Sequence, residues 1–271
     1  NDLTNPYMAS IYSSIARAAE AAGYDLLLGA GTGPTSHEGP LINTLLSHQV
    51  CGLILESPFM PTKQLSDLIA GAPSVLVGRY ESLPNLDVAT TDEVQAASLV
   101  IGHLMDLGHV EIAHISGGRT ASSRARVQAY KKAMTKAGLT PWVVHGSFTE
   151  QGGREAAREL LVDTGFPTAV IAANDLIAVG AMATFRSVGL DVPADISVVG
   201  YDNSQIAQLD LVQLTSVKQD VDAFGMAAVD LLIDRIENDR TENVIRLFDA
   251  SLEVRATTGP VAPRHRMIRP A

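Results

Sequence analysis

The stretch VPADISVVGYDN, residues 192–203, is the part of this chain that says most about its fold. It contains an apolar run typical of a buried strand, which breaks at a glycine and ends in Tyr-Asp-Asn. Open α/β sheets bind ligands beyond the carboxyl ends of their strands, so Asp202 stands where an acid would meet a small molecule. The alternative interpretation is that Asp202 only caps the next turn, which is a common role for aspartate.

The composition is that of a globular protein with a large core. The chain has 271 residues, of which 46% are hydrophobic and 18% charged, enough for one or two domains. Its net charge of −10 disfavours direct binding of nucleic acid, because an acidic surface repels phosphates. There is no membrane-length apolar run and no cleavable signal at the start, so we expect a soluble, cytoplasmic protein without membrane contacts. A processed secreted protein would also lack a signal peptide.

Motifs for catalysis, metal binding and cofactor binding are absent from the sequence. GAGTGP at 29–34 follows an apolar run, but a proline stands where a dinucleotide loop needs its third glycine. No GxxxxGK[ST], GxSxG or HExxH occurs, and the seven histidines lack metal-ligand spacing beside carboxylates. The single cysteine, Cys51, excludes an internal disulfide and is predicted to be buried in its apolar run, 50–56. We therefore predict no catalytic residue, no metal and no cofactor.

Short apolar runs alternate with amphipathic helical stretches along the chain. The expected strands are 25–28, 51–56, 75–78, 111–116, 142–145, 169–173, 196–200, 215–218 and 244–248. Apolar residues at helical spacing lie between most of them. This alternation predicts right-handed βαβ units and parallel sheets, and the similar spacing on each side of Leu107–Gly108 favours two sheets over one.

The beginning of the chain departs from this alternation. NDLTNPYM, residues 1–8, leads directly into a helical stretch, whereas a βα alternation starts with a strand. We therefore expect native residues before Asn1 to supply at least one further strand.

Polar and aromatic residues gather where expected strands end and helices begin. They are Tyr7, Met8, Arg79, Asp92, Thr120, Ser122, Arg124, Arg126, Phe148, Asn174, Asp175 and Asp202. Taken singly, Asp92 and Asp175 are good helix N-caps, and Arg124 fits a solvated helix position. Together, these carboxylate, amide and guanidinium groups can hold hydroxyls or a heterocycle, while aromatic faces cover the apolar side of a ring.

The order of motifs resembles the ligand-binding core of the lactose-repressor-type (LacI/GalR) transcriptional regulators. The matching segments cover essentially the whole chain: NPYM (5–8), GYDLLL (23–28), VCGLIL (50–55), LGHVEIAHISGG (107–118), SSRARVQAY (122–130), GSFTEQGGREAAREL (146–160), FPTAVIAANDLIAVGAM (166–182), GLDVPADISVVGYDN (189–203), LTSVKQD (214–220) and LEVRATTGP (252–260). So long a series is far more specific than any one short motif.

The resemblance implies an α/β fold of two Rossmann-like lobes with parallel sheets, joined by three crossovers, as in type I periplasmic-binding-protein-like folds. An effector would bind in the cleft between the lobes. The N-lobe would comprise 1–107 plus 221–242, and the C-lobe 108–220 plus 243–271. The resemblance also implies a homodimer and an N-terminal helix-turn-helix that is missing from this chain.

Nine positions become candidates for effector binding: Tyr7, Met8, Arg79, Ser122, Arg126, Phe148, Asn174, Asp202 and Gln219. By resemblance, Arg126 matches the arginine that pairs with effector hydroxyls or carboxylates. Asp202 matches the aspartate that accepts hydrogen bonds from the effector. Asn174 matches a cleft amide, Phe148 matches an aromatic wall, and Tyr7 matches the first of two aromatics after Asn-Pro.

Three positions depart from the pattern of the family. Met8 replaces the second aromatic, so stacking there would be weaker. Gly78–Arg79 stands where family members commonly carry Asp-Arg, which removes a cleft carboxylate and opens the site to a more anionic or less hydroxylated effector. Asp92–Glu93 replaces the usual Asp-Asn, and we assign that position to contacts between the lobes rather than to the ligand.

We interpret the chain as the effector-binding and dimerisation core of a transcriptional regulator, a repressor, and not as an enzyme. Lobe closure on a ligand would change operator affinity through the missing DNA-binding domain. Asn174, Asp202 and Arg126 favour a sugar effector, whereas Phe148 with Tyr7 could sandwich a purine or nucleoside. A monomeric periplasmic sugar-binding protein of a transporter shares the expected fold and is the alternative. A two-lobed dehydrogenase is a third interpretation, but this sequence lacks the cofactor-binding loop that such an enzyme needs.

Overall fold

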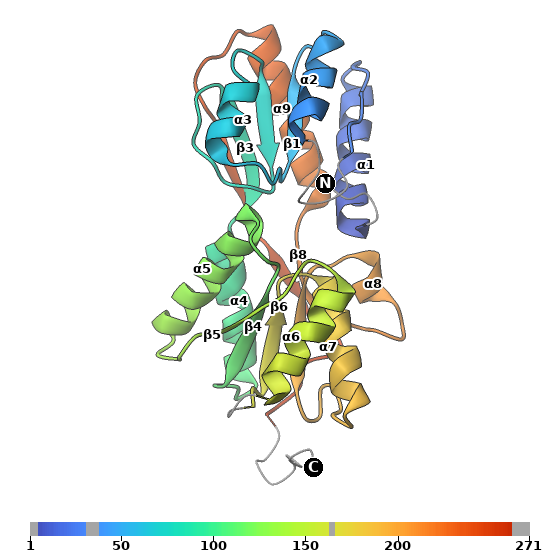
Figure 1. The fold of residues 1–271 in the computed structure, drawn as a ribbon, viewed down its shortest axis with the longest axis vertical. Coiled ribbons are helices and arrows are strands. Elements are labelled where there is room, and N and C mark those ends of the chain that lie inside the picture. Colours follow the sequence, from blue (N-terminus) through green and yellow to red (C-terminus); the bar gives the residue numbers. More distant parts are fainter. Residues whose placement is uncertain (1–4, 31–37, 163–165, 262–271) are drawn as a thin grey trace. The chain divides into compact units, whose positions relative to one another are not determined.

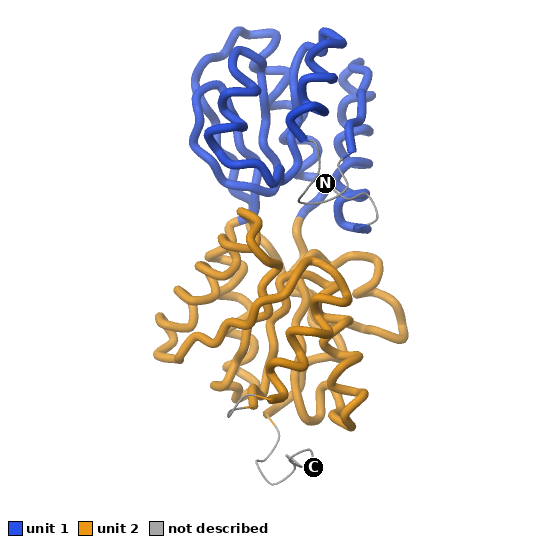
Figure 2. The backbone as a smooth tube through the Cα atoms, viewed as in Figure 1, with its two compact units in different colours: residues 1–91, 220–248 blue, residues 92–219, 249–271 orange. Residues whose placement is uncertain are grey.

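The computed structural model has the expected α/β fold (Figure 1) and describes residues 5–30, 38–162 and 166–261. The chain forms two compact units (Figure 2): unit 1 is Asn1–Thr91 with Asp220–Phe248, and unit 2 is Asp92–Gln219 with Asp249–Ala271. The chain therefore passes from one unit to the other three times, and each unit is built around its own sheet.

Unit 1 contains a parallel sheet with helices on both faces. Its strands, in spatial order, are β1 (Leu53–Glu56), β2 (Ser74–Val77), β3 (Leu86–Thr91) and β9 (Ile245–Phe248). Its helices are α1 (Pro6–Ala21), α2 (Glu38–Ser47), α3 (Thr62–Leu68) and α9 (Val221–Glu237). Helices α1 and α9 pack with Val75 and Val77 on one face, whereas α2 and α3 pack with Leu53 and Leu76 on the other.

A buried ion network joins the two sequence-remote pieces of unit 1. Asp87 on β3 is fully buried and lies 2.6 Å from a guanidinium nitrogen of Arg235 and 2.6 Å from one of Arg240. It also accepts a hydrogen bond from the backbone N–H of Val244. Burial alone would raise the pKa of Asp87, but the hydrogen bonds from Arg240 and Arg235 outweigh it and lower this pKa below its ordinary value.

Residues 25–28 do not form the expected strand. Leu26, Leu27 and Leu28 have no regular secondary structure and are between 37% and 53% exposed. A parallel strand needs a partner for its N–H and C=O groups, and a cavity lined by this segment and by β1 takes the place of that partner. Cys51 lines the same cavity just before β1 and is exposed, so the prediction of a buried thiol was wrong.

This cavity in unit 1 has a volume of about 480 Å³ and a largely apolar lining. Side chains from three helices and from β1 line it, among them Ile11, Ile42, Leu53, Val229 and Ile233. Among the strands that the structure describes, β1 is at one edge of its sheet, beside this cavity. The strand expected from residues before Asn1 stays a prediction. The segment 29–34, which we excluded as a dinucleotide loop, lies mostly outside the described residues.

Unit 2 contains a six-stranded sheet with one antiparallel edge. Its strands, in spatial order, are β10 (Ser251–Glu253), β8 (Thr215–Lys218), β7 (Ser197–Asp202), β6 (Ala169–Ala172), β4 (Ile112–Ser116) and β5 (Trp142–His145). Its helices are α4 (Glu93–Asp106), α5 (Ala121–Lys136), α6 (Glu150–Val162), α7 (Asp175–Ser187) and the short α8 (Gln205–Gln208). Helices α4 and α5 cover one face, and α6 and α7 cover the other (Figure 1).

Two glycines allow α6 and α7 to pack closely. A Cβ atom at Gly180 would lie 2.0 Å from the carbonyl oxygen of Glu150, and one at Gly153 would lie 2.2 Å from that of Ile177. Real Cβ contacts are longer than this, so any side chain at either position would force the helices apart.

The unit boundaries differ from the expected lobes by more than one residue at two places. Helix α4 belongs to unit 2, because Val100 and Leu104 pack in one cluster with Tyr130. The boundary thus falls before α4 and not at Leu107–Gly108. Strand β9 belongs to unit 1, because it pairs in parallel with β3, so the later boundary follows residue 248 and not 242.

Candidate functional site

The predicted site residues of unit 2 gather at the carboxyl ends of its strands. Asp202 ends β7 and Gln219 follows β8, and the Nε2 of Gln219 donates to Oδ1 of Asp202 over 2.8 Å. Arg126 on α5 brings a guanidinium nitrogen to 3.6 Å from the same oxygen. These three candidates therefore lie together at one edge of the sheet, and their role in effector binding stays a prediction.

Asp202 is held in an unfavourable environment. Its side chain is buried, and its φ of 104° lies in the left-handed region, which a residue other than glycine rarely adopts. Burial raises the pKa of Asp202 well above its ordinary value. The Arg126 cation lowers it, and the carboxylates of Asp175 and Glu93 raise it further. A hydrogen-bond donor on a ligand would therefore stabilise the Asp202 carboxylate.

Arg126 is surrounded by groups that favour its charge. Its guanidinium carbon lies 3.6 Å from the centre of the Tyr201 ring and 5.9 Å from that of Phe148. One nitrogen donates to the carbonyl oxygen of Ala173, and Nε lies 3.3 Å from Oε1 of Glu93. The arginine is thus oriented along the strand ends by an aromatic face, a carbonyl and a carboxylate.

Glu93 and Tyr201 belong to this cluster, although neither was among the nine candidates. The Tyr201 hydroxyl donates to Oε2 of Glu93 over 2.8 Å, while the other oxygen of Glu93 faces Arg126. Glu93 was assigned instead to contacts between the lobes. A carboxylate in place of the usual amide was the signal available for Glu93, and Tyr201 directly precedes Asp202 at the end of the strand.

Asn174 and Asp175 lie beside the cluster with structural partners. Asn174 is the N-cap of α7, and its side chain accepts from the N–H of Ile177. Asp175, expected as a cap, is instead buried and accepts hydrogen bonds from Ser204 and Ser216. Burial raises the pKa of Asp175, although these hydrogen bonds lower it.

The remaining polar positions of unit 2 are more peripheral. The Phe148 ring packs on Gly117, where a Cβ atom would lie 2.3 Å from it. Ser122 contacts the hydroxyl of Thr120, which caps α5, and Arg124 is exposed as expected. Asp92 caps α4, as its sequence position indicated.

The three candidates of unit 1 are engaged within that unit. Tyr7 is buried in the apolar cluster of α1 and α9, and Met8 packs against the same cluster. Arg79 is buried and donates to two backbone carbonyls, of Pro58 and Met60, and to the side chains of Thr62 and Glu81. These bonds use all five guanidinium N–H groups, so the structure gives Arg79 a structural role in place of the expected effector contact.

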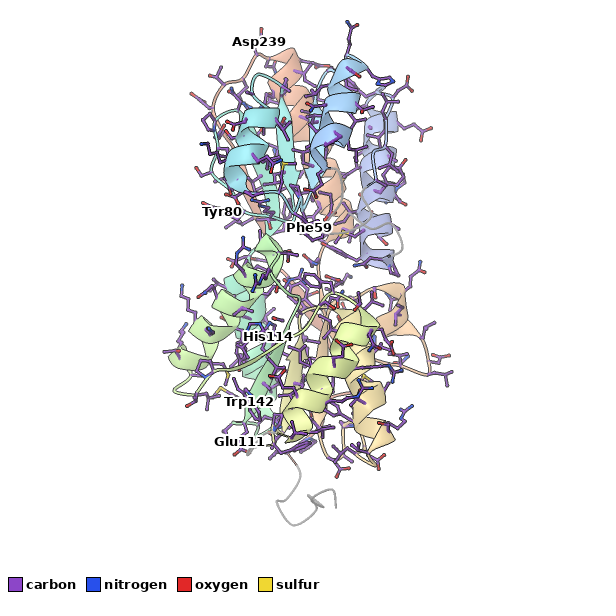
Figure 3. The ribbon with its side chains drawn as sticks, in the orientation of Figure 1. Phe59, Tyr80, Glu111, His114, Trp142 and Asp239 are labelled. Atoms are coloured by element: carbon purple, nitrogen blue, oxygen red, sulfur yellow. The ribbon has the colours of Figure 1, made fainter. Side chains whose placement is uncertain are left out.

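His114 is another buried titratable group of unit 2. It lies on β4, next to the strand that carries Trp142 (Figure 3), and it stacks on Tyr130 with ring centroids 5.1 Å apart. Burial lowers the pKa of His114 to about 3, so its ring is neutral at physiological pH. No three His, Cys, Asp or Glu side chains gather as a metal site in the described part of the chain.

Comparisons with known proteins agree with this geometry. The family model of the periplasmic binding protein-like domain matches residues 101–258. Catabolite control protein A of Priestia megaterium is 30% identical over 263 residues, which are 95% of this chain and 79% of that protein. The chain belongs to the LacI family of transcriptional regulators.

Solved structures of transcriptional regulators are similar to nearly the whole of this chain. A LacI transcriptional regulator from a Rhodococcus species is 35% identical with a TM-score of 0.91, over 97% of this chain and 98% of that one. A complex of the transcriptional regulator CelR with cellobiose is 32% identical with a TM-score of 0.84, over 93% of this chain and 79% of that one.

The LacI-family assignment confirms the interpretation as a transcriptional regulator over the transporter alternative. These relatives are regulators and not enzymes, which fits the interpretation of the chain as a non-enzyme. Among the helices of the described residues, none has the length and apolar character needed to cross a membrane. The cytoplasmic location stays a prediction.

Proposed function

We propose that the cluster around Asp202 binds the small-molecule effector of this LacI-family regulator, and that the effector is a sugar. The observation that carries the proposal is the Asp202 carboxylate, which is buried, strained and placed beside Arg126 and Gln219. Sugar hydroxyls can donate to the carboxylate and accept from the guanidinium and amide groups. The half-buried Phe148 ring can cover the apolar face of a pyranose.

The position of the cluster in the chain supports a link to regulation. Glu93 is the second residue of unit 2 after the chain first leaves unit 1 at Thr91, and Gln219 is the last residue of unit 2 before the chain enters unit 1 again. A ligand that changes the hydrogen bonds of these residues therefore acts beside two of the three crossing segments. Hinges of this kind absorb the change in backbone angles when two domains move.

The purine alternative has weaker support than the sugar. It needs two aromatic faces, and Tyr7, one of the expected pair, is only 5% exposed in the core of unit 1. The DNA contact through a preceding helix-turn-helix and the homodimer stay predictions. The net charge of −10 supports placing the DNA contact outside this chain.

A thermal-shift panel of cellobiose, ribose, glucose, adenine and guanosine tests the proposal. We expect a sugar to raise the Tm, by the equivalent of about 2.7 kcal/mol at a hundredfold excess over Kd. Asp202→Asn is the informative variant, because asparagine tolerates positive φ and keeps the shape of the side chain. It should remain folded and lose sugar binding, and Asp202→Ala should lose it as well.

Asp239→Asn is the matched control, since Asp239 is exposed in unit 1 (Figure 3) and also has a positive φ, of 46°. It should leave sugar binding unchanged. Unaltered sugar affinity in folded Asp202→Asn protein would refute the site assignment. A shift by purines alone would replace the sugar by the alternative effector class.

A further inference from the structure

Arg126 is the cation with which an anionic ligand would pair at this site, and carboxyl groups of the protein already pair with it. Glu93 lies 3.3 Å from its Nε, and Asp202 lies 3.6 Å from one of its terminal nitrogens. The side chains of Arg126 and Glu93 are only 10% and 15% exposed, so water screens this pair weakly. The hydroxyl of Tyr201 holds Glu93 in place from the other side.

The charges around Asp202 are dominated by carboxylates. Glu93 and Asp175 both act on Asp202 as anions, whereas Arg126 acts on it as a cation. Two further cations on neighbouring segments face other groups: Lys218 lies 3.8 Å from Glu253, and Arg255 donates to Asn203 and Leu214. The cluster thus places one guanidinium among three carboxyl groups, of which Glu93 lies nearest to Arg126.

A ligand phosphate or carboxylate would meet repulsion here. To bind Arg126 it would have to displace Glu93 or approach both Glu93 and Asp202, and like charges at such distances repel strongly in a buried site. An uncharged ligand avoids this conflict, because its hydroxyls can donate to the carboxylates and leave the ion pair intact.

We propose that Glu93 makes this site selective for uncharged ligands, because it occupies Arg126 and so removes the cation that an anionic ligand would need. This inference rests on the proposed effector site. It reverses the expectation of a more anionic effector that we drew from Gly78–Arg79. Arg79 donates its hydrogen bonds to partners in unit 1, so it does not provide a second cation for an anionic ligand.

The first test uses inorganic phosphate alone and needs no knowledge of the effector. The protein is titrated with phosphate while the ¹⁵Nε resonance of Arg126, assigned by comparison with Arg126→Lys, is followed by NMR. We expect no saturable shift in the wild type and a saturable one in Glu93→Gln, with affinity at least tenfold tighter. Glutamine keeps the size of the side chain and an acceptor for Tyr201, and it removes the charge.

Glu81→Gln is the matched control, because it neutralises the carboxylate that pairs with another buried arginine, Arg79, in unit 1. It should not change phosphate binding at Arg126. If Glu93→Gln fails to fold, Glu93→Asn provides a second uncharged variant. Saturable phosphate binding at Arg126 in the wild type would overturn the proposal, and so would the absence of any gain in a folded Glu93 variant.

The second test compares ribose with ribose 5-phosphate and glucose with glucose 6-phosphate by calorimetry. The wild type should prefer the uncharged member of any pair it binds, and Glu93→Gln should narrow that preference. Tighter binding of a phosphorylated member by the wild type would contradict the selectivity while leaving the effector site in place. Sugar binding that survives in Asp202→Asn would instead refute the site itself, so the two failures are distinguishable.

Discussion

Unit 1 and unit 2 use the same alternation of strands and helices but treat buried charge in opposite ways. In unit 1, the buried Asp87 and Arg79 are fully engaged with oppositely charged and backbone groups, and the pKa of Asp87 is lowered. In unit 2, Asp202 and Asp175 are buried with raised pKa values, because burial outweighs their partners. Buried charge in unit 1 therefore holds sequence-remote segments together, whereas in unit 2 it leaves carboxylates that a ligand can stabilise.

The largest expected effect comes from breaking the ion network of unit 1. Asp87→Ala leaves Arg235 and Arg240 without their shared carboxylate and should destabilise unit 1 by about 3–5 kcal/mol. The single tryptophan, Trp142, lies in unit 2, so its fluorescence reports on that unit while circular dichroism reports on both. In urea, the dichroism should show an early transition while the fluorescence midpoint stays close to that of the wild type.

Asp230→Ala on the exposed side of α9 is the control for this experiment and should leave both signals near the wild type. An equal shift of the Trp142 transition in Asp87→Ala would mean that the two units unfold as one. In that case the contrast between them would not extend to their stability.

The next effect concerns the packing of unit 2. Gly180→Ala places a methyl group against the backbone of Glu150 and should destabilise unit 2 by about 1–3 kcal/mol. Here the fluorescence midpoint should fall. Gly102→Ala on α4 makes the same change in open space and should be neutral or stabilising by roughly 0.5–1 kcal/mol. Equal effects of the two substitutions would show that α6 and α7 can separate without cost.

A third expected effect is a difference in pH dependence between the two units. The pKa of His114 falls from 6.5 to about 3 on folding, so below pH 6.5 the unfolded chain binds a proton that the folded chain does not. Unit 2 should therefore lose about 1.4 kcal/mol per pH unit from this group as the pH falls. The raised pKa values of Asp202 and Asp175 act with the opposite sign and offset part of the loss.

Unit 1 should keep its stability to lower pH. Because the pKa of Asp87 is lowered from 3.8, the stability that it contributes is complete above 3.8 and is lost only as the pH falls through the lowered value. Urea midpoints from fluorescence and dichroism between neutral pH and about pH 4 measure the difference. His114→Phe, which keeps the stacking on Tyr130, should flatten the fluorescence profile, and an unchanged profile would exclude His114 as its cause.

Much of the fold could be predicted because buried parallel strands are apolar runs with clear ends. The runs at 142–145 and 215–218 form the expected strands, and 169–173 forms a strand one residue shorter. The apolar run 25–28 does not form a strand. A strand also needs a neighbouring strand to pair with, and the residues of the run do not show whether such a neighbour is present. Cys51 was wrongly predicted to be buried for the same reason, since it lines the cavity between this run and β1.

The candidate site could be predicted only where the strand pattern alone determines position. Asp202 and Gln219 end neighbouring strands, so their contact follows from the parallel sheet. The choice of partner for each arginine is a different problem. Arg126 pairs with Glu93, 33 positions away, and Arg79 turns to Glu81 in its own unit, and both choices depend on three-dimensional packing.

The Asp87 network also determines when unit 1 can complete its folding during synthesis of the protein. Asp87 and Arg235 are 148 positions apart, and at about 5–20 residues per second a ribosome needs roughly 7–30 seconds to travel from one to the other. During that interval the first piece of unit 1 has emerged without α9 and β9, while most of unit 2 is completed behind it. The apolar faces of the first piece of unit 1 that α9 covers in the folded protein therefore stay exposed until that helix has been made.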